Sequence, residues 1–218
     1  GKPSEAVAYP HGGSPGPSRR STTLQVRPCP QRYWHTPHVA NERSPFLTGG
    51  LEWIFEGTVP EACPTCDWDW SVPAEDALAA IARAPSRYSD LLEGRDGMAR
   101  AADGGWNATA YLWHLTDLAR SWTERWVQVG AMPGSLLAGW DPDVLAEARN
   151  YRALPTVAAE WALSDAVSSF VAQCNRLDLD ATFQHGDWGQ GTVSDGIRWL
   201  GHEFVHHQLD VDARAVQA

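Results

Sequence analysis

The pair His202 and His206 is the feature of this sequence that points most directly to chemistry. On a helix, residues four apart lie on one face with their Cβ atoms about 5–6 Å apart, so both imidazoles can bind one metal ion. Together with Glu203 the pair forms the HExxH pattern of zinc peptidases. Such peptidases take a third ligand from further downstream, but the residues beyond His207 include no His or Glu. We therefore expect the third ligand upstream.

His114 is the candidate for that third ligand. It lies near the start of an expected helix, and metal sites in helical bundles are built from side chains on facing helices. Nitrogen ligands from His114, His202 and His206 would leave a fourth position open for water or substrate, which is the arrangement of catalytic sites. Imidazoles suit a divalent metal, with Zn²⁺ as the first choice and Ni²⁺ or Fe²⁺ as alternatives. Three unrelated polar or buried histidines are the other interpretation.

Four further polar residues have expected roles beside this site. Glu203 is a candidate catalytic base, and its alternative role is to orient a ligand. Asp117 and Asp210 are candidates for carboxylates that hydrogen-bond to an imidazole and orient it. His207 lies five residues from His202, about 140° round the helix. We therefore expect it to line the substrate pocket and not to share the ion.

The twelve tryptophans are unusual for a chain of 218 residues. Trp113 and Trp199 lie close to the histidines in sequence and are candidates to pack a flat substrate. Tyr111 is a candidate either for the substrate pocket or for the core. His185 lies in a polar segment and is expected at the surface. Helical spacing predicts burial for most of five tryptophans, namely Trp113, Trp122, Trp126, Trp161 and Trp199.

The segment Cys63–Cys66 has the spacing of half a zinc knuckle. Cys29, His35 and His38 could supply the other half. Two free thiols near a helix start are an alternative, and a redox pair is another, although the expected βαβ setting of a redox motif is missing. Four cysteines do not form a disulfide framework for a chain of this length.

The elements that must position these residues are expected to be helices, because apolar residues recur three or four apart from about residue 71. Ser71 is the expected cap of the first helix, and Pro85 is expected to kink or break it. Thr192 and Asp195 resemble a capping box at the start of the last helix. No strand alternation is visible, so the sequence predicts an all-α four-helix bundle. The expected helices are Ala74–Glu93, Asn107–Val129, a short one from Asp141 to about Leu154, Val157–Leu177, and one that begins at Thr192 and carries the histidine pair.

The chain divides by composition into an irregular N-terminal extension, residues 1–58, and a metal-binding helical bundle, residues 59–218. The first fifty residues hold eight of the fifteen prolines and show neither a helical nor a strand period. We expect them to lie as an arm on the bundle or on the partner subunit of a homodimer.

The charge and hydropathy of the chain limit its partners. A net charge of −10 and a pI near 5.1 disfavour nucleic acid and anionic membranes. No apolar run approaches the roughly 18 residues of a membrane span. The N-terminal residues lack the apolar core of a signal peptide, so we expect a cytoplasmic protein that acts on a small molecule.

Three motifs together resemble the DinB-like superfamily over roughly residues 60–215. They are Trp106-Asn107 opening a helix, His114-Leu115-Thr116-Asp117, and the terminal Gly201-His202-Glu203-Phe204-Val205-His206-His207. That superfamily includes the metal-binding domain of mycothiol-dependent maleylpyruvate isomerase and the bacillithiol and mycothiol S-transferases.

The resemblance implies a four-helix bundle with a three-histidine metal site. His114 corresponds to the ligand on the second helix, and His202 and His206 correspond to the pair on the last. Many members of the superfamily continue the last motif with Arg-Gly-Gln, whereas this chain has Gln208-Leu209-Asp210.

The function implied by the resemblance is metal-dependent thiol chemistry. A low-molecular-weight thiol such as mycothiol would be held as thiolate and would attack an electrophile, in S-transfer or thiol-assisted isomerisation. A second hypothesis places hydroxide on the metal with Glu203 as base, giving a hydrolase, lyase or cyclase of secondary metabolism. A third is a non-catalytic module that stores metal or dimerises. A zinc peptidase comes last, because it lacks the downstream ligand.

Overall fold

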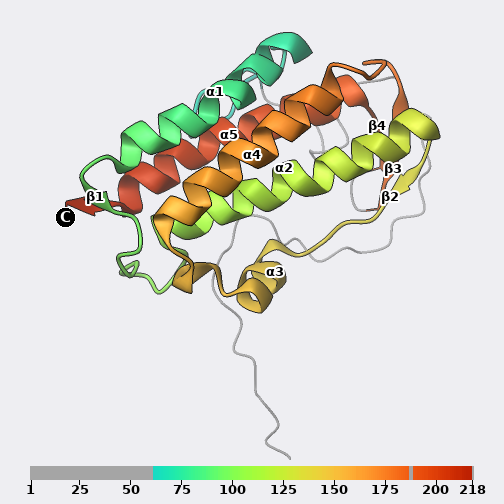
Figure 1. Ribbon diagram of the computed structural model, residues 1–218. Helices are drawn as coiled ribbons and strands as arrows, with labels where there is room; N and C mark the ends of the chain where they lie inside the picture. Colours follow the sequence, from blue (N-terminus) through green and yellow to red (C-terminus); the bar gives the residue numbers. More distant parts are fainter. Residues whose placement is uncertain (1–60, 187–188, 218) are drawn as a thin grey trace, which may run out of the picture. The chain divides into compact units, whose positions relative to one another are not determined.

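The structure is a computed structural model that describes residues 61–186 and 189–217. The expected extension over residues 1–58, with Cys29, His35 and His38, lies outside the described residues. Within them the chain folds as a bundle of helices, which confirms the expected all-α four-helix bundle (Figure 1). No helix in the described part of the chain is long and apolar enough to cross a membrane.

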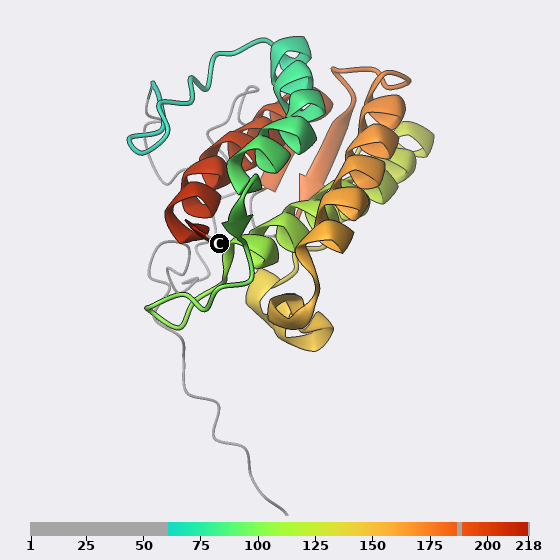
Figure 2. The same cartoon turned by 60° about the vertical axis from the view of Figure 1, so that its left-hand side comes forward.

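The bundle brings together the two helices that carry the predicted metal ligands. Helix α1 lies along α5 and α2 lies along α4, while contacts of α1 with α4 and of α2 with α5 close the bundle (Figures 1 and 2). A short helix, α3, and one 3₁₀ turn, η2, connect α2 to α4. The helical elements are α1 (Ala74–Leu92), α2 (Ala108–Ala131), α3 (Pro142–Arg149), η2 (Tyr151–Ala153), α4 (Thr156–Cys174) and α5 (Val193–Arg214).

The starts of α2 and α5 are set by the caps that the sequence predicts. The side chain of Asn107 accepts a 2.8 Å hydrogen bond from the backbone nitrogen of Ala110. Thr192 and Asp195 form the predicted capping box, in which each side chain accepts a hydrogen bond from the backbone nitrogen of the other residue. Because these caps fix where each helix begins, they also fix the direction in which its histidines point.

The cap expected for α1 is wrong, and so is the break considered at Pro85. Ser71 does not cap the helix, because Pro73 occupies the N-cap position and Ser71 donates from its backbone nitrogen and its hydroxyl to Asp69. The helix also does not break at Pro85, although a proline inside a helix costs about 3 kcal/mol. The apolar side chains around it offset this cost, since Ile81 and Tyr88 are fully buried on either side of the proline.

The described residues also include two small sheets that the sequence does not predict. Strand β1 (Arg95–Asp96) pairs antiparallel with β5 (Val216–Gln217). Strand β2 (Leu136–Leu137) pairs parallel with β3 (Thr182–His185), which pairs antiparallel with β4 (Gly189–Thr192). Strands of two to four residues are too short to show a period of two in the sequence.

Two burial predictions are wrong for reasons of geometry. Trp161 is 72% exposed. It lies two residues, about 200° of helix, from the buried Leu163, so it faces away from the core. His185 was expected at the surface but is 2% exposed, because β3 packs it against Trp122, with the ring centroids 6.3 Å apart and nearly parallel.

Candidate metal centre

Helix α5 carries two pairs of metal-binding side chains on neighbouring faces. His202 and His206 form one i,i+4 pair, and Glu203 and His207 form a second. Because each residue turns a helix by about 100°, the second pair points about 100° away from the first. The described residues accordingly gather into two groups of donors, and within each group the donor atoms lie within 4.8 Å of one another.

The first group, the carboxylate–histidine cluster, consists of His114 from α2 with Glu203 and His207 from α5. Oε2 of Glu203 lies 3.4 Å from Nε2 of His207 and 4.0 Å from Nε2 of His114. The two imidazole rings are nearly perpendicular, with centroids 5.3 Å apart. One carboxylate and two imidazoles therefore converge from two facing helices.

This donor set fits a divalent metal ion. Nitrogen and oxygen donors about 2.0–2.1 Å from a tetrahedral zinc ion are about 3.4 Å from one another, which is close to the separations found in the cluster. Nδ1 of His207 lies 2.7 Å from Oδ2 of Asp210. This contact leaves Nε2 of His207 as the ring nitrogen available to a metal, and it holds the ring in place.

Two of the three side chains of the cluster, Glu203 and His114, are held in the forms that bind metal, and His207 is not. Burial would raise the pKa of Glu203, but the contacts with His114, His202 and His207 outweigh burial and hold it well below its usual range. At His114 burial dominates and lowers the pKa. Burial also opposes the charged form of His207, yet Asp210 and Glu203 raise its pKa to about 9. A metal ion must therefore displace a proton from His207.

The second group, the cysteine–histidine cluster, consists of Cys63 and Cys66, from the segment before α1, with His202 and His206. Sγ of Cys63 lies 3.7 Å from Nδ1 of His206. Burial would raise the pKa of Cys63, but the backbone N–H groups of Cys66 and Thr65 and the two histidines lower it to about 6. Burial, followed by the neighbouring Cys63, raises the pKa of Cys66 to about 11.

The three histidines that the sequence predicts around one ion are divided between the two clusters. His114 lies with Glu203 and His207, whereas His202 and His206 lie with the cysteines. His207, expected only to line the pocket, supplies a donor. Glu203 stands between the clusters, because its Oε2 belongs to the first and its Oε1 lies 3.4 Å from Nδ1 of His202.

Asp117, the other predicted orienting carboxylate, is engaged elsewhere. It accepts hydrogen bonds from the guanidinium of Arg149 and from the hydroxyl of Tyr151. Burial and then this hydrogen bond raise the pKa of Tyr151, so its hydroxyl keeps its proton. Asp117 therefore connects α2 to α3 and η2, which close one side of the bundle.

Aromatic rings border the carboxylate–histidine cluster. The ring centroid of His114 lies 5.1 Å from that of Trp106 and 6.2 Å from that of Trp140. The ring of Tyr111 lies 5.1 Å from that of His207. Tyr111 is among the substrate-binding candidates that the sequence predicts. Trp106 and Trp140 are not, because they precede α2 and α3, where helical spacing predicts no buried face.

The other two substrate-binding candidates are held by different contacts. Trp113 is 8% exposed and packs under the guanidinium of Arg149, 5.6 Å from its ring centroid. Trp199 is 9% exposed and packs on Trp122 in the core, with ring centroids 5.7 Å apart.

Sequence reasoning missed the pairing of Glu203 with His207, although a signal for it was present. The i,i+4 rule applies to these two residues as it does to His202 and His206. A CxxC segment also requires two more ligands to complete a zinc site. Two interleaved pairs on one helix could have been matched to two partners, His114 and the Cys63–Cys66 segment.

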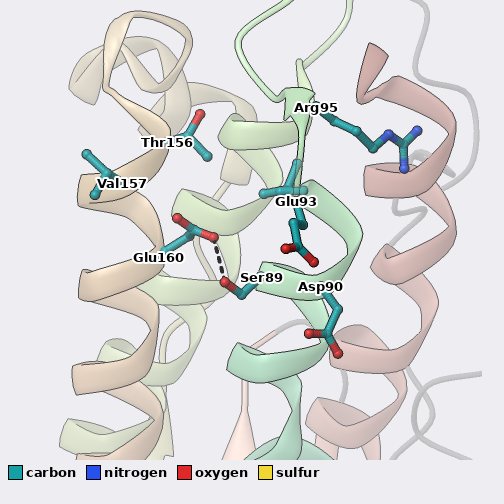
Figure 3. Close-up of a pocket in the computed structure, with 8 residues that line it drawn as sticks. Ser89, Asp90, Glu93, Arg95, Thr156, Val157 and Glu160 are labelled. Atoms are coloured by element: carbon teal, nitrogen blue, oxygen red, sulfur yellow. Dashed lines mark hydrogen bonds between the residues drawn. The ribbon is translucent and has the colours of Figure 1, made fainter. Parts of the chain in front are cut away.

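A separate hollow of about 570 Å³ lies between α1 and α4. Figure 3 shows the carboxylates of Asp90, Glu93 and Glu160 around it, and the hydroxyl of Ser89 donates a 3.0 Å hydrogen bond to Glu160. No residue of either cluster lines this hollow. It is therefore not part of the candidate metal centre.

Comparisons with known proteins show a shared fold. No protein-family model matches the sequence, and no curated protein matches it. Among solved structures, the chain is similar to YfiT from Bacillus subtilis, described as a probable metal-dependent hydrolase with an unusual four-helix bundle topology. The two are 15% identical, with a TM-score of 0.57 over 75% of this chain and 97% of YfiT. This likeness confirms the four-helix bundle that the sequence predicts.

Proposed function

We propose that this protein is a metal-dependent enzyme that acts on a small molecule, with the carboxylate–histidine cluster as its centre and a low-molecular-weight thiol as its nucleophile. The observation that carries the proposal is the convergence of three donors, His114, Glu203 and His207, from two facing helices. A divalent metal held there would supply Lewis acidity and would lower the pKa of a thiol bound in the remaining position.

The number of donors and their exposure favour catalysis. Three protein donors leave one position of a tetrahedral ion for a substrate, whereas structural sites are closed by four. The side chains of Glu203 and His207 are 14% and 16% exposed to solvent, so a small molecule can approach the cluster from their side. The rings of Trp106 and Tyr111 beside the histidines offer a surface on which a flat substrate can pack.

The carboxylates near the cluster favour a nucleophile that needs no separate base. Glu203 is itself a donor, and Asp210 contacts His207. Asp117 is engaged by Arg149. A thiol, whose ordinary pKa is about 8.5, loses its proton when it coordinates a metal.

The proposed group transfer is a nucleophilic substitution at an electrophilic carbon. The thiolate sulfur forms a bond to an electrophilic carbon, and the bond from that carbon to the leaving group breaks. The leaving group departs with the bonding electron pair, and the thiol proton passes to solvent. In this proposal Glu203 acts as a donor to the centre and not as the base.

Hydrolysis is the second candidate, because YfiT, whose fold this chain shares, is described as a probable metal-dependent hydrolase. Both candidates use the same three donors. They differ in the nucleophile, which is a thiol in one and water in the other.

Thiol binding to the cobalt-loaded protein tests the first candidate without knowledge of the electrophile. The protein carries Cys63→Ser and Cys66→Ser, so that its own thiolates near the centres are removed. Titration with mycothiol, or with cysteine for comparison, is expected to produce a saturating thiolate-to-cobalt absorption band, because the thiol takes the position left by the three donors.

His114→Ala in the same background is the matched control and is expected to give no band. A double-serine protein that shows no band at millimolar thiol would contradict the thiol proposal. If that protein nevertheless hydrolyses an activated ester such as p-nitrophenyl acetate, and His114→Ala abolishes the hydrolysis, the second candidate holds.

A further inference from the structure

We propose that Cys63, Cys66, His202 and His206 form a second metal site, a structural zinc site closed by four protein ligands. This site lies beside the carboxylate–histidine cluster on α5 but shares no donor with it. The proposal does not rest on the proposed function, because the two sites draw on different side chains.

The donor atoms have the types and spacing of a tetrahedral zinc site. Two thiolates and two imidazoles are one of the common structural ligand sets for zinc. All four donors lie within 4.8 Å of one another. With Zn–S about 2.3 Å and Zn–N about 2.0 Å, a tetrahedral site places sulfur and nitrogen about 3.5 Å apart, and the Cys63 to His206 distance is 3.7 Å.

The backbone holds the two cysteines in a tight turn. The nitrogen of Asp67 donates to the carbonyl of Cys63 at 2.9 Å, and the nitrogen of Cys63 donates to the carbonyl of Trp68 at 2.8 Å. Asp67 has the left-handed φ of 55°, which reverses the chain after Cys66. The turn therefore presents both sulfurs toward α5 without needing the metal to shape it.

Two tryptophans seat this turn on the helix beside the histidines. The ring of Trp68 packs against the bare backbone of Gly201, where an added Cβ would lie 2.7 Å from Cη2 of the indole. The ring of Trp70 packs on His202, with centroids 4.6 Å apart. The residue before the first histidine ligand must therefore be small for the cysteines to reach the helix.

The buried imidazole of His202 gives an independent sign that a ligand is missing from its surroundings. The residue is 2% exposed, its Nδ1 lies 3.4 Å from Oε1 of Glu203, and its Nε2 has no hydrogen-bond partner among the described residues. A buried polar atom without a partner costs about 1–3 kcal/mol. A metal ion bound to Nε2 would satisfy that atom, while Nδ1 keeps its contact with Glu203.

The site would link the segment before α1 to the last helix. That segment is also joined to α5 by the packing of its two tryptophans and by a 2.8 Å hydrogen bond from Arg198 to the carbonyl of Val72, and the metal would add to the stability of this corner of the fold. By holding His202 in place, the metal would also hold Oε1 of Glu203, which lies beside His202. The other oxygen of Glu203, Oε2, belongs to the carboxylate–histidine cluster. The structural site would in this way hold a donor of the proposed catalytic centre in place.

Metal content of the purified full chain, measured by mass spectrometry, tests the proposal. The wild type is expected to hold about two equivalents of zinc, and Cys63→Ser/Cys66→Ser about one. Cys174→Ala is the matched control, because Cys174 is another buried cysteine but lies at the end of α4, and it is expected to keep both equivalents. A double variant with the zinc content of the wild type would overturn the proposal, as would a disulfide between Cys63 and Cys66.

Cobalt loading separates this proposal from the proposed function. The wild type and His114→Ala are both expected to show a thiolate-to-cobalt band without added thiol, and the double serine variant is expected to lose it. If His114→Ala keeps this band and loses the other equivalent, the two sites are independent. Absence of the band in the wild type would overturn the structural site and leave the proposed function to its own test.

Gly201→Ala leaves all four ligands unchanged. It therefore tests the zinc site without removing a ligand side chain. Its Cβ must push the indole of Trp68 off the helix, so zinc retention against a chelator is expected to fall by about 10-fold or more, as for other residues that hold ligands in position. Gly196→Ala is the control, because it also adds a methyl group against a tryptophan of the core, but its neighbours are Trp126 and Trp122 of α2 and not Trp68 of the turn. Equal zinc retention in the two variants would contradict the assigned role of the turn.

Discussion

Replacing His207 with alanine is expected to lower the affinity of the carboxylate–histidine cluster for zinc by more than about 100-fold, because the loss of residues that only orient metal ligands already costs about 10–100-fold. His207 supplies one of three donors, 3.4 Å from Glu203. The measurement is zinc affinity in competition with a chelator. The measurement is made in the Cys63→Ser/Cys66→Ser background, so that it reports zinc binding at the carboxylate–histidine cluster alone.

His206→Ala provides the most closely matched control, since it is the same substitution one residue away on the same helix. In the double-serine background it is expected to leave the carboxylate–histidine cluster able to bind zinc. In the wild-type background it is expected to weaken metal binding at the other site, which loses one of its four ligands. The opposite pattern, with zinc at the first centre lost in His206→Ala and kept in His207→Ala, would favour a site of His114, His202 and His206.

Replacing Trp126 with alanine is expected to reduce the free energy of unfolding by about 3–5 kcal/mol, the usual cost of removing a buried aromatic side chain. Trp126 is fully buried between α2 and α5, with its ring 4.8 Å from Trp122 and 5.6 Å from Phe183. The loss is a large share of the about 5–15 kcal/mol typical of a domain. Denaturant unfolding of the zinc-loaded protein measures it.

A double-mutant cycle with Gly196 tests whether this tryptophan requires the glycine. An added Cβ at Gly196 would lie 2.5 Å from Cη2 of Trp126. Gly196→Ala alone is therefore expected to cost about 1–3 kcal/mol by overpacking. In the Trp126→Ala background it should be neutral or stabilising, because alanine is favoured over glycine in helices by about 1 kcal/mol. Costs that add to within about 0.5 kcal/mol would contradict this contact.

The helices were predictable because their signals are local. Asn107 and the Thr192–Asp195 capping box mark helix starts within a few residues, and apolar positions three or four apart mark the buried faces. Trp161 shows the limit of that reasoning, since a large apolar residue was taken as buried although its phase on α4 points outward. His185 shows another, because a four-residue strand leaves no periodic trace.

The side chains that could hold a metal were largely predictable by residue type, but their grouping was not. His114, His202, His206 and Glu203 could be named from residue type and spacing alone. Which of them meet depends on the direction of each pair on α5 relative to α2 and to the turn before α1. A difference of one residue rotates a pair by about 100° and assigns it to a different partner. The doubled pattern on α5 thus faces two clusters of donor atoms, with Glu203 in contact with both.

The most direct test of the central claim is the position of the bound metal, measured by anomalous X-ray scattering at the zinc edge from crystals of the zinc-loaded protein. The account predicts a peak bounded by His114, Glu203 and His207, with one further position open. A peak bounded by His114, His202 and His206, or no peak at the carboxylate–histidine cluster, would contradict it.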